Sequence, residues 1–410
     1  MRLLVVSQYF WPETFRVNEI VSELCARGHQ VTVLTGRPNY PQGEVFPEYL
    51  ARPEDFNQYA GAEVIRVPLR PRGQGGLRLL LNYLSFVFWA SLAGPWKLRG
   101  RKFDAIFVWE TSPITSALPA ILLKKLKRAP LLMWVLDLWP DTLSAVGLVR
   151  SKRLLDALGL LVQFIYNHCD LILAQSKGFF PAIERWSGAP HKSRYFPQWA
   201  EAAFDVGLDA ATAPELLEHQ HHFNIMFAGN IGEAQDFPAI LDAAHRLRDR
   251  SDIRWLIVGD GRAAPAVRET ITRLALQDSV FMFGRHPLHR MPEFFHGADA
   301  LLVSLKAEPI FSMTIPGKVQ SYLAAGRPLL GMLDGEGARV IEEAGAGLVC
   351  AAGDGAALAE RALRLAGMSA GERDAMGLRG QAYGKEQFDR ASLMSQLERW
   401  LQESGRGATN

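Results

Sequence analysis

The chain has 410 residues, of which 48% are hydrophobic and 21% charged, a balance typical of globular proteins and unlike that of disordered chains. This length is sufficient for two hydrophobic cores. Its three cysteines lie far apart and lack the spacing of a zinc site or a disulfide framework, so we expect a reducing compartment. The apolar run at residues 1–7 is too short for a signal peptide and predicts a buried first strand.

The net charge of +2 is unevenly distributed along the chain. Residues 1–200 carry a net charge of +9, and residues 201–410 carry −7. The segment 64–128 alone contains 12 basic and 2 acidic residues. A local excess of this size predicts an anionic partner at that face of the protein.

Strands and helices are predicted to alternate through the first half of the chain. Residues 15–27 have the helical spacing of apolar residues, and Gly28 ends this helix. Buried strands are predicted from the apolar runs Leu3–Ser7, Gln30–Thr35, Ala62–Val67, Phe103–Trp109, Leu131–Leu136 and Leu171–Gln175. This order predicts a parallel, doubly wound sheet over residues 1–200.

The same pattern restarts after an irregular polar stretch at residues 197–222. Strands are predicted at Asn224–Ala228, Arg254–Val258, Ser279–Phe283, Ala300–Leu305 and Leu329–Leu333, with helices at Pro238–Asp249, Pro265–Leu276, Met291–His296 and Ala391–Glu403. The sequence therefore predicts two similar α/β halves, with the junction in the polar stretch.

Residues 77–98 are unusually apolar and are flanked by basic residues. A spanning helix needs ~20 uninterrupted apolar residues. Asn82 and the Gly94-Pro95 pair, which is expected to break the helix, argue against spanning. Two interpretations remain, a buried core helix with solvated ends and a helix lying on an anionic membrane surface. The basic cluster at residues 124–128 favours the second.

In the second half, glycine-containing loops follow the predicted strands. Gly229-Asn230-Ile231-Gly232 allows a ligand to approach the backbone closely, although a structural turn would need the same glycines. Gly259 and the loop at Gly284-Arg285-His286 are weaker signals of the same kind.

The motif Thr314-Ile315-Pro316-Gly317-Lys318 precedes a predicted helix. Pro and Gly near a helix start leave free backbone N–H groups, and Lys318 adds a positive charge, which together suit a diphosphate. The alternative is a solvated surface lysine. Gly335-Glu336-Gly337-Ala338-Arg339 follows the next strand and indicates contacts to sugar hydroxyls and phosphate.

The first half places polar residues at the carboxyl ends of its predicted strands, where open α/β sheets bind ligands. Arg16 follows the first strand and is either a phosphate contact or a solvated helix-start residue. Tyr40, Glu110, Asp137 and Trp139 follow three other strands. Asp137 is suited to orienting or deprotonating a hydroxyl, and Trp139 either stacks on a sugar or packs in the core.

These residues, in this order, resemble the GT-B glycosyltransferases of the family-4 type over nearly the whole chain. The general signature is the opening strand, the stretch at 27–33 and Ala324-Ala325-Gly326-Arg327-Pro328. The chain is also similar to the WbuB-type subgroup of bacterial L-fucosamine transferases of O-antigen or capsule assembly. That closer similarity lies in Asn39–Gly43, Asp137–Pro140, Gly229–Gly232, Ile315–Tyr322 and Gly335–Arg339.

The resemblance implies two Rossmann-like, doubly wound domains facing a central cleft. Residues 1–200 would bind the acceptor, residues 201–390 the nucleotide sugar, and the helix at 391–403 would pack back on the first domain. The donor would be a UDP-sugar such as UDP-N-acetyl-L-fucosamine, and the acceptor a lipid-linked (undecaprenyl-diphosphate) glycan. The reaction would need no cofactor, metal or nucleic acid and would retain the anomeric configuration. The enzyme would be cytoplasmic and peripheral to the inner membrane.

Two departures from the family pattern matter. The glutamates that the family spaces as E-x7-E fall on Met313 and Ser321, and the usual cation after the first strand of the second domain is replaced by Asn230. Phosphate binding is therefore expected to rest on Lys318, Arg16 and Arg339. The candidate residues are Asp137, Lys318 and Arg16 for catalysis, Gly229, Asn230, Gly232, Gly259, Arg285, Thr314, Gly317, Lys318, Glu336, Gly337 and Arg339 for the donor, and Tyr40, Glu110 and Trp139 for the acceptor.

Three other functions compete with this one. A GT-B-fold sugar-nucleotide epimerase would need no acceptor, and the basic apolar segment 64–128 argues against it. A non-catalytic binding subunit of a polysaccharide assembly complex is supported by the loss of the two glutamates. A nicotinamide-dependent oxidoreductase is disfavoured because no G-x-G-x-x-G motif follows the first strand.

Overall fold

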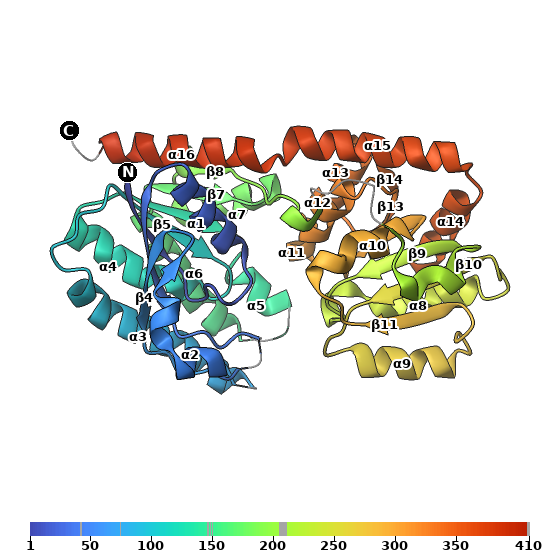
Figure 1. Cartoon of the computed structure of the whole chain (residues 1–410), viewed down its shortest axis with the longest axis horizontal. Coiled ribbons are helices and arrows are strands. Elements are labelled where there is room, and N and C mark those ends of the chain that lie inside the picture. The colour runs from blue at the N-terminus through green and yellow to red at the C-terminus, as the bar shows by residue number, and fades with distance from the viewer. Residues whose placement is uncertain are drawn as a thin grey trace. The chain divides into compact units, whose positions relative to one another are not determined.

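The computed structural model describes residues 1–41, 43–73, 75–145, 147, 149, 151–204 and 211–407. The chain forms two compact units. The first comprises Met1–Phe196 together with the residues from Ala391 onward, and the second comprises Pro197–Arg390. Each unit contains one sheet with helices on its faces (Figure 1).

The first unit has an eight-stranded sheet in the order β3-β4-β2-β1-β5-β6-β7-β8. All neighbours are parallel except β3 and β4. The strands are β1 (Arg2–Val6), β2 (Gln30–Gly36), β3 (Gln58–Tyr59), β4 (Ala62–Val67), β5 (Ala105–Glu110), β6 (Leu131–Val135), β7 (Leu171–Ala174) and β8 (Ser193–Tyr195). The helices are α1 (Arg16–Ala26), α2 (Pro47–Ala51), α3 (Gly76–Lys97), α4 (Ala117–Lys127), α5 (Asp141–Ala145), α6 (Lys152–His168), α7 (Phe180–Ser187) and α16 (Arg390–Gly407).

The second unit has a six-stranded parallel sheet in the order β11-β10-β9-β12-β13-β14. Its strands are β9 (Phe223–Ala228), β10 (Ile253–Val258), β11 (Val280–Gly284), β12 (Ala300–Ser304), β13 (Leu329–Met332) and β14 (Gly347–Cys350). Its helices are α8 (Phe237–Arg246), α9 (Ala264–Arg273), α10 (Met291–His296), α11 (Pro309–Ser312), α12 (Gly317–Ala324), α13 (Glu336–Glu343), α14 (Gly355–Ala366) and α15 (Ala370–Gln387).

The core of the second unit shows why its strands appear as continuous apolar runs. Ile225 and Phe227 of β9 belong to one buried cluster, whereas Met226 and Ala228 belong to another. Successive side chains of a strand point to opposite faces of the sheet, so both faces are covered. The two sheets confirm the predicted pair of Rossmann-like α/β folds.

Helix α3 corrects one expectation from the sequence. The Gly94-Pro95 pair does not break the helix, which continues through Pro95 to Lys97. Proline removes one hydrogen bond of the helix, and here only two further residues follow it. Gly94 is buried against Leu34 of β2, where a Cβ would lie 3.2 Å from a methyl carbon, so the glycine is needed for packing.

The same helix is not a buried core helix. It is long and apolar enough to cross a membrane by length and composition, but only 22% of its most apolar window is buried. Its buried side is narrow and includes Tyr83 and Phe86. Its exposed apolar side chains are Leu77, Leu80, Leu84, Phe88, Trp89, Leu92 and Trp96.

Helix α16 belongs to the first unit although it is the last element of the chain (Figure 1). The carboxylate of Glu398 accepts hydrogen bonds from Arg27 at 3.1 Å and lies 3.0 Å from the His29 ring. The Trp400 ring lies edge-on to Phe196, with the centroids 5.9 Å apart. Polar and aromatic contacts therefore fix the helix beside β2 and β8.

Candidate functional site

In the first unit, the predicted residues gather at the carboxyl ends of β1, β2, β5 and β6. The strand order reverses between β1 and β5, and ligands of open α/β sheets bind at such a point. Arg16 begins α1 after β1, with its guanidinium mostly buried and 3.7 Å from the Glu19 carboxylate. Glu110 is the last residue of β5, and Asp137 follows β6.

Glu110 and Asp137 form a pair of carboxyl groups, of which Glu110 is buried and Asp137 is half-buried. Glu110 is fully buried and accepts hydrogen bonds from the backbone N–H groups of Asp137 and Leu136. Burial, and secondly the nearby Asp137 carboxylate, raise the pKa of Glu110 well above its usual value. Burial also raises the pKa of Asp137, which a hydrogen bond with Ser112 partly opposes. The pair therefore retains a proton to higher pH than exposed carboxylates do.

The two aromatic candidates of this unit differ in accessibility. Trp139 is 6% exposed, and its indole N–H donates to the Ser112 hydroxyl at 3.0 Å. The structure thus shows Trp139 packing in the core. Tyr40 is half-buried against Tyr9 and Phe15, with its ring centroid 5.5 and 5.1 Å from theirs.

Glu13 organises this edge of the sheet, and the sequence interpretation did not identify it. Its carboxylate, 3% exposed, accepts backbone N–H groups of Asn39 and Tyr40, both at 2.7 Å, and of Phe10 at 3.0 Å. Burial raises its pKa to about 7, although these three hydrogen bonds act in the opposite direction. Glu13 therefore ties the loop after β1 to the loop after β2.

In the second unit, two predicted glycines allow the loops after β9 and β10 to touch. Gly229 has φ +133°, and a Cβ on it would lie 2.7 Å from Lys318 Cε. Gly259 has φ +148°, and a Cβ on it would lie 1.9 Å from the Gly229 carbonyl oxygen. Both positions require glycine, Gly259 for packing and Gly229 for the close approach of Lys318.

Lys318 is the most unusual side chain of this edge. It lies in the first turn of α12, and its ammonium is 3.4 Å from the centroid of the Phe227 ring. Burial lowers its pKa from 10.5 to about 7. Within the described ranges of the chain, no carboxylate pairs with it, so a cation–π contact is its main stabilisation. An uncompensated, half-buried ammonium favours an incoming anion.

The other donor candidates surround the start of α12. A Cβ placed on Gly335 would lie 2.0 Å from the Ser312 carbonyl oxygen, and one placed on Gly337 would lie 3.0 Å from Pro316 Cδ. The loop before α13 therefore packs against the loop before α12. The Thr314 hydroxyl donates to the Ile310 carbonyl at 2.9 Å. Asn230 and Arg285 are exposed, and Gly232 precedes a short 3-10 turn.

Two side chains here have partners that the sequence did not predict. Arg339 donates to Glu336 at 2.8 Å and Glu343 at 2.6 Å, and these hydrogen bonds raise its pKa, so its charge is already compensated. Ser321, which stands where the family has a glutamate, donates to the carboxylate of Glu201. Glu201 lies in the segment before β9, and no local pattern marks it.

Replacing Gly229 should disturb Lys318 directly. In Gly229→Ala, the methyl group would displace the Lys318 side chain, and the positive φ would cost roughly 1–3 kcal/mol. We expect weaker binding of UDP in titration calorimetry and a lower Tm. Gly371→Ala is the matched control, because a Cβ there meets nothing within 4 Å. Equal UDP affinity in both variants would show that Gly229 does not position Lys318.

The two sheets, each with a switch point in its strand order, form a GT-B glycosyltransferase fold. The structure aligns with Anabaena HepE in complex with UDP and glucose, at a TM-score of 0.68, 16% identity and coverage of 98% of this chain and 99% of that one. It also aligns with sucrose-phosphate synthase of Thermosynechococcus elongatus, at a TM-score of 0.73, 13% identity and coverage of 98% of both chains.

Two family models match consecutive parts of the sequence. A glycosyl transferase 4-like domain matches residues 14–199, and a domain of the glycosyl transferases group 1 matches residues 222–367. The chain therefore belongs to the glycosyltransferases that combine these two domains, and it is an enzyme of that class. It is 27% identical over 348 residues to WcaI of Escherichia coli (strain K12), named for colanic acid biosynthesis, with coverage of 80% of this chain and 82% of WcaI.

Proposed function

We propose that this enzyme transfers a sugar from a UDP-sugar donor to a lipid-linked (undecaprenyl-diphosphate) glycan during bacterial cell-surface polysaccharide synthesis. The second unit binds the donor, and the first unit binds the acceptor. The observation that carries this proposal is the ammonium of Lys318, which pairs with no carboxylate of the described residues and lies beside the N–H groups at the start of α12. The named ligands of HepE, UDP and glucose, and the named pathway of WcaI support it.

In the proposed reaction, the bond between the donor sugar carbon and the diphosphate breaks. Lys318 and the Gly317 N–H stabilise the negative charge that develops on the departing diphosphate, without a metal ion. The acceptor hydroxyl oxygen forms the new bond to that carbon, and its proton passes to the leaving phosphate. The configuration of the sugar is retained.

The carboxyl pair of the first unit has a part in this proposal. Asp137 and Glu110, whose pKa values burial raises, orient the acceptor hydroxyl by hydrogen bonding. The leaving phosphate is the proposed proton acceptor. In this proposal, Tyr40 and the main chain of the loops tied by Glu13 form the acceptor surface, and Arg16 contributes positive charge.

A membrane-bound acceptor accounts for the exposed apolar face of α3. Helices α3, α4 and α6 expose Phe88, Leu126 and Leu160, with exposed fractions of 59, 55 and 66%. Arg99, which follows α3, and Lys125, which precedes Leu126, are exposed as well. Apolar side chains beside cations are typical of helices that lie on an anionic bilayer. We therefore propose a cytoplasmic enzyme that is peripheral to the inner membrane through segment 64–128.

The test is release of UDP from a panel of UDP-sugars, including UDP-N-acetyl-L-fucosamine, with and without an extract of lipid-linked glycans. Release that depends on the extract is expected and identifies the donor. Conversion of the donor sugar without an acceptor would indicate an epimerase. Binding of UDP with neither release nor conversion, for any donor, would indicate a binding subunit and refute the proposal.

A further inference from the structure

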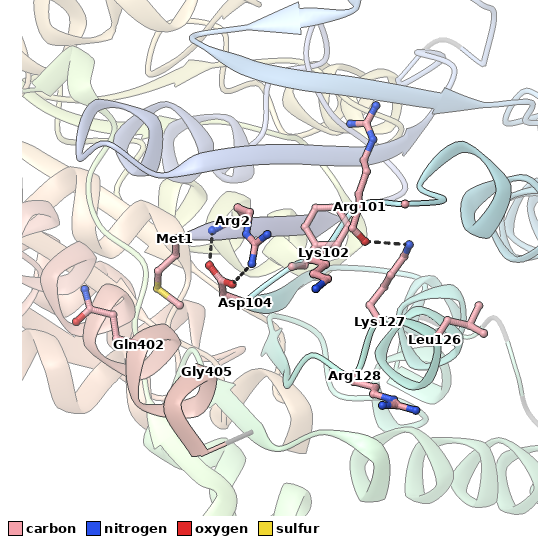
Figure 2. Close-up of a pocket in the computed structure, with 12 residues that line it drawn as sticks. Met1, Arg2, Arg101, Lys102, Asp104, Leu126, Lys127, Arg128, Gln402 and Gly405 are labelled. Atoms are coloured by element: carbon pink, nitrogen blue, oxygen red, sulfur yellow. Dashed lines mark hydrogen bonds and ion pairs between the residues drawn. The ribbon is translucent and has the colours of Figure 1, made fainter. Parts of the chain in front are cut away.

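A basic pocket lies at the amino-terminal edge of the first sheet, opposite the edge that carries the candidate site (Figure 2). Its volume is about 880 Å³. Arg2 begins β1, the loop from Gly100 to Asp104 leads into β5, and Lys127 and Arg128 end α4. Gln402 and Gly405 of α16 complete the wall. None of the residues that line this pocket is a candidate for catalysis, donor binding or acceptor binding. The pocket therefore needs a separate explanation.

The cations of this pocket outnumber its anions. Five basic side chains line it, against the single carboxylate of Asp104. That carboxylate pairs with Arg2 at 2.9 Å, as Figure 2 shows. Arg101 pairs with Glu63 outside the pocket. These two arginines are therefore compensated, and three other basic side chains remain.

The remaining three cations are Lys102, Lys127 and Arg128. Among the described residues, the Lys127 ammonium donates to the carbonyl groups of Leu98 and Arg101 and to no carboxylate. Burial, together with the nearby Arg101 charge, lowers the pKa of Lys127. Lys102 and Arg128 are exposed and have no hydrogen bond or ion pair among the residues that the structure describes. Three uncompensated cations around one pocket favour an anion with several oxygen atoms.

The surroundings of the pocket distinguish a lipid from a free anion. Leu126 lines the pocket and is 55% exposed. Trp96, 65% exposed, ends the apolar side of α3 just before Gly100 enters the pocket. A free phosphate needs no such neighbours, whereas a phospholipid has acyl chains beside its phosphate. We propose that the pocket binds the phosphate headgroup of an anionic membrane lipid, with the acyl chains against α3 and α4. This inference rests on the proposed membrane association and specifies it.

The experiment compares two double charge reversals by co-sedimentation with phosphatidylcholine vesicles that contain or lack phosphatidylglycerol. The pocket variant carries Lys102→Glu and Arg128→Glu. The matched control carries Lys97→Glu and Lys125→Glu, which reverse two exposed cations outside the pocket. We expect the pocket variant to lose at least roughly tenfold more affinity for the anionic vesicles than the control does. Circular dichroism melts, and the milder pair Lys102→Gln with Arg128→Gln, check that the loss is not unfolding.

Equal losses in the two reversals would overturn the proposal, because a diffuse surface attraction would explain them. Saturable binding of inorganic phosphate to the wild type, without preference for anionic vesicles, would overturn the lipid assignment in favour of a free anion. UDP release by the wild type with detergent-solubilised acceptor is measured in parallel. Its absence would refute the proposed function, whereas its presence without vesicle selectivity would refute only the lipid site.

Discussion

Lys318→Met is expected to reduce kcat by about 10²–10³-fold, the usual loss when one donor that stabilises a developing anion is removed. Methionine keeps most of the side-chain volume over the Phe227 ring but carries no charge. Because the half-buried ammonium has no carboxylate partner in the described part of the chain, its removal should leave the Tm unchanged or raise it. Steady-state UDP release and a thermal melt measure the two effects.

Lys385→Met is the control for this substitution, since Lys385 is an exposed residue of α15. Its kcat should equal that of the wild type. Near-normal turnover of Lys318→Met would show that the leaving diphosphate is stabilised elsewhere.

The lowered pKa of Lys318 also fixes the direction of two pH dependences. The diphosphate favours the ammonium, so binding takes up a proton above pH 7, and UDP affinity should fall by up to about tenfold per pH unit there. In the unfolded chain the pKa is near 10.5, so between about pH 7 and 10.5 the unfolded state binds more protons. The Lys318 contribution to the free energy of unfolding therefore rises with pH across this window. Both dependences should vanish in Lys318→Met.

Glu13→Ala is expected to destabilise the first unit by roughly 3 kcal/mol or more, because three buried backbone N–H groups lose their acceptor at roughly 1–3 kcal/mol each. Glu13→Gln should cost less, since its amide oxygen still accepts the Asn39 and Tyr40 groups. Urea unfolding followed by circular dichroism measures both. Glu44→Ala, which changes an exposed glutamate of the loop after β2, is the control. Equal midpoints for Glu13→Ala and Glu44→Ala would refute the role of Glu13.

The pKa of Glu13 predicts how this stability depends on pH. Its pKa is about 7 in the folded protein and near 4.5 in the unfolded chain. The folded state therefore binds more protons between these values, and the Glu13 contribution to the free energy of unfolding is largest below about pH 4.5. It is lost as the pH rises through about 7. The wild type should show this decline, and Glu13→Gln should not.

The sequence predicted the central strands of both sheets because parallel strands buried on two faces form continuous apolar runs, whereas the edge strands β3, β8 and β14 were not predicted. The polar and glycine-rich loops that follow these runs could be placed at the carboxyl edges of the sheets, because parallel strands all end at the same edge. The contacts that define the site could not be predicted, because they join residues distant in the chain. Lys318 contacts Phe227 only when α12 packs beside β9. Ser321 donates a hydrogen bond to Glu201, which lies 120 residues earlier in the chain.

One local interpretation was wrong for an identifiable reason, and a second involves a residue with contacts that were not predicted. Gly94 and Pro95 are helix breakers in isolation, but near the end of α3 their cost is small and Gly94 serves close packing. Arg339 was predicted to bind phosphate from its place after a glycine-rich loop. The carboxylates of Glu336 and Glu343, three and four positions away on the same helix, already compensate it.

The membership of α16 in the first unit has a consequence for synthesis of the protein. The β-strands of that unit leave the ribosome long before α16, because the whole second unit, Pro197–Arg390, is translated in between. At about 5–20 residues per second, this interval lasts roughly 10–40 s. Throughout it, Phe196 lacks the Trp400 ring, and Arg27 and His29 lack Glu398. The surface of the nascent first unit that α16 covers is therefore exposed to solvent until the last helix has been synthesised.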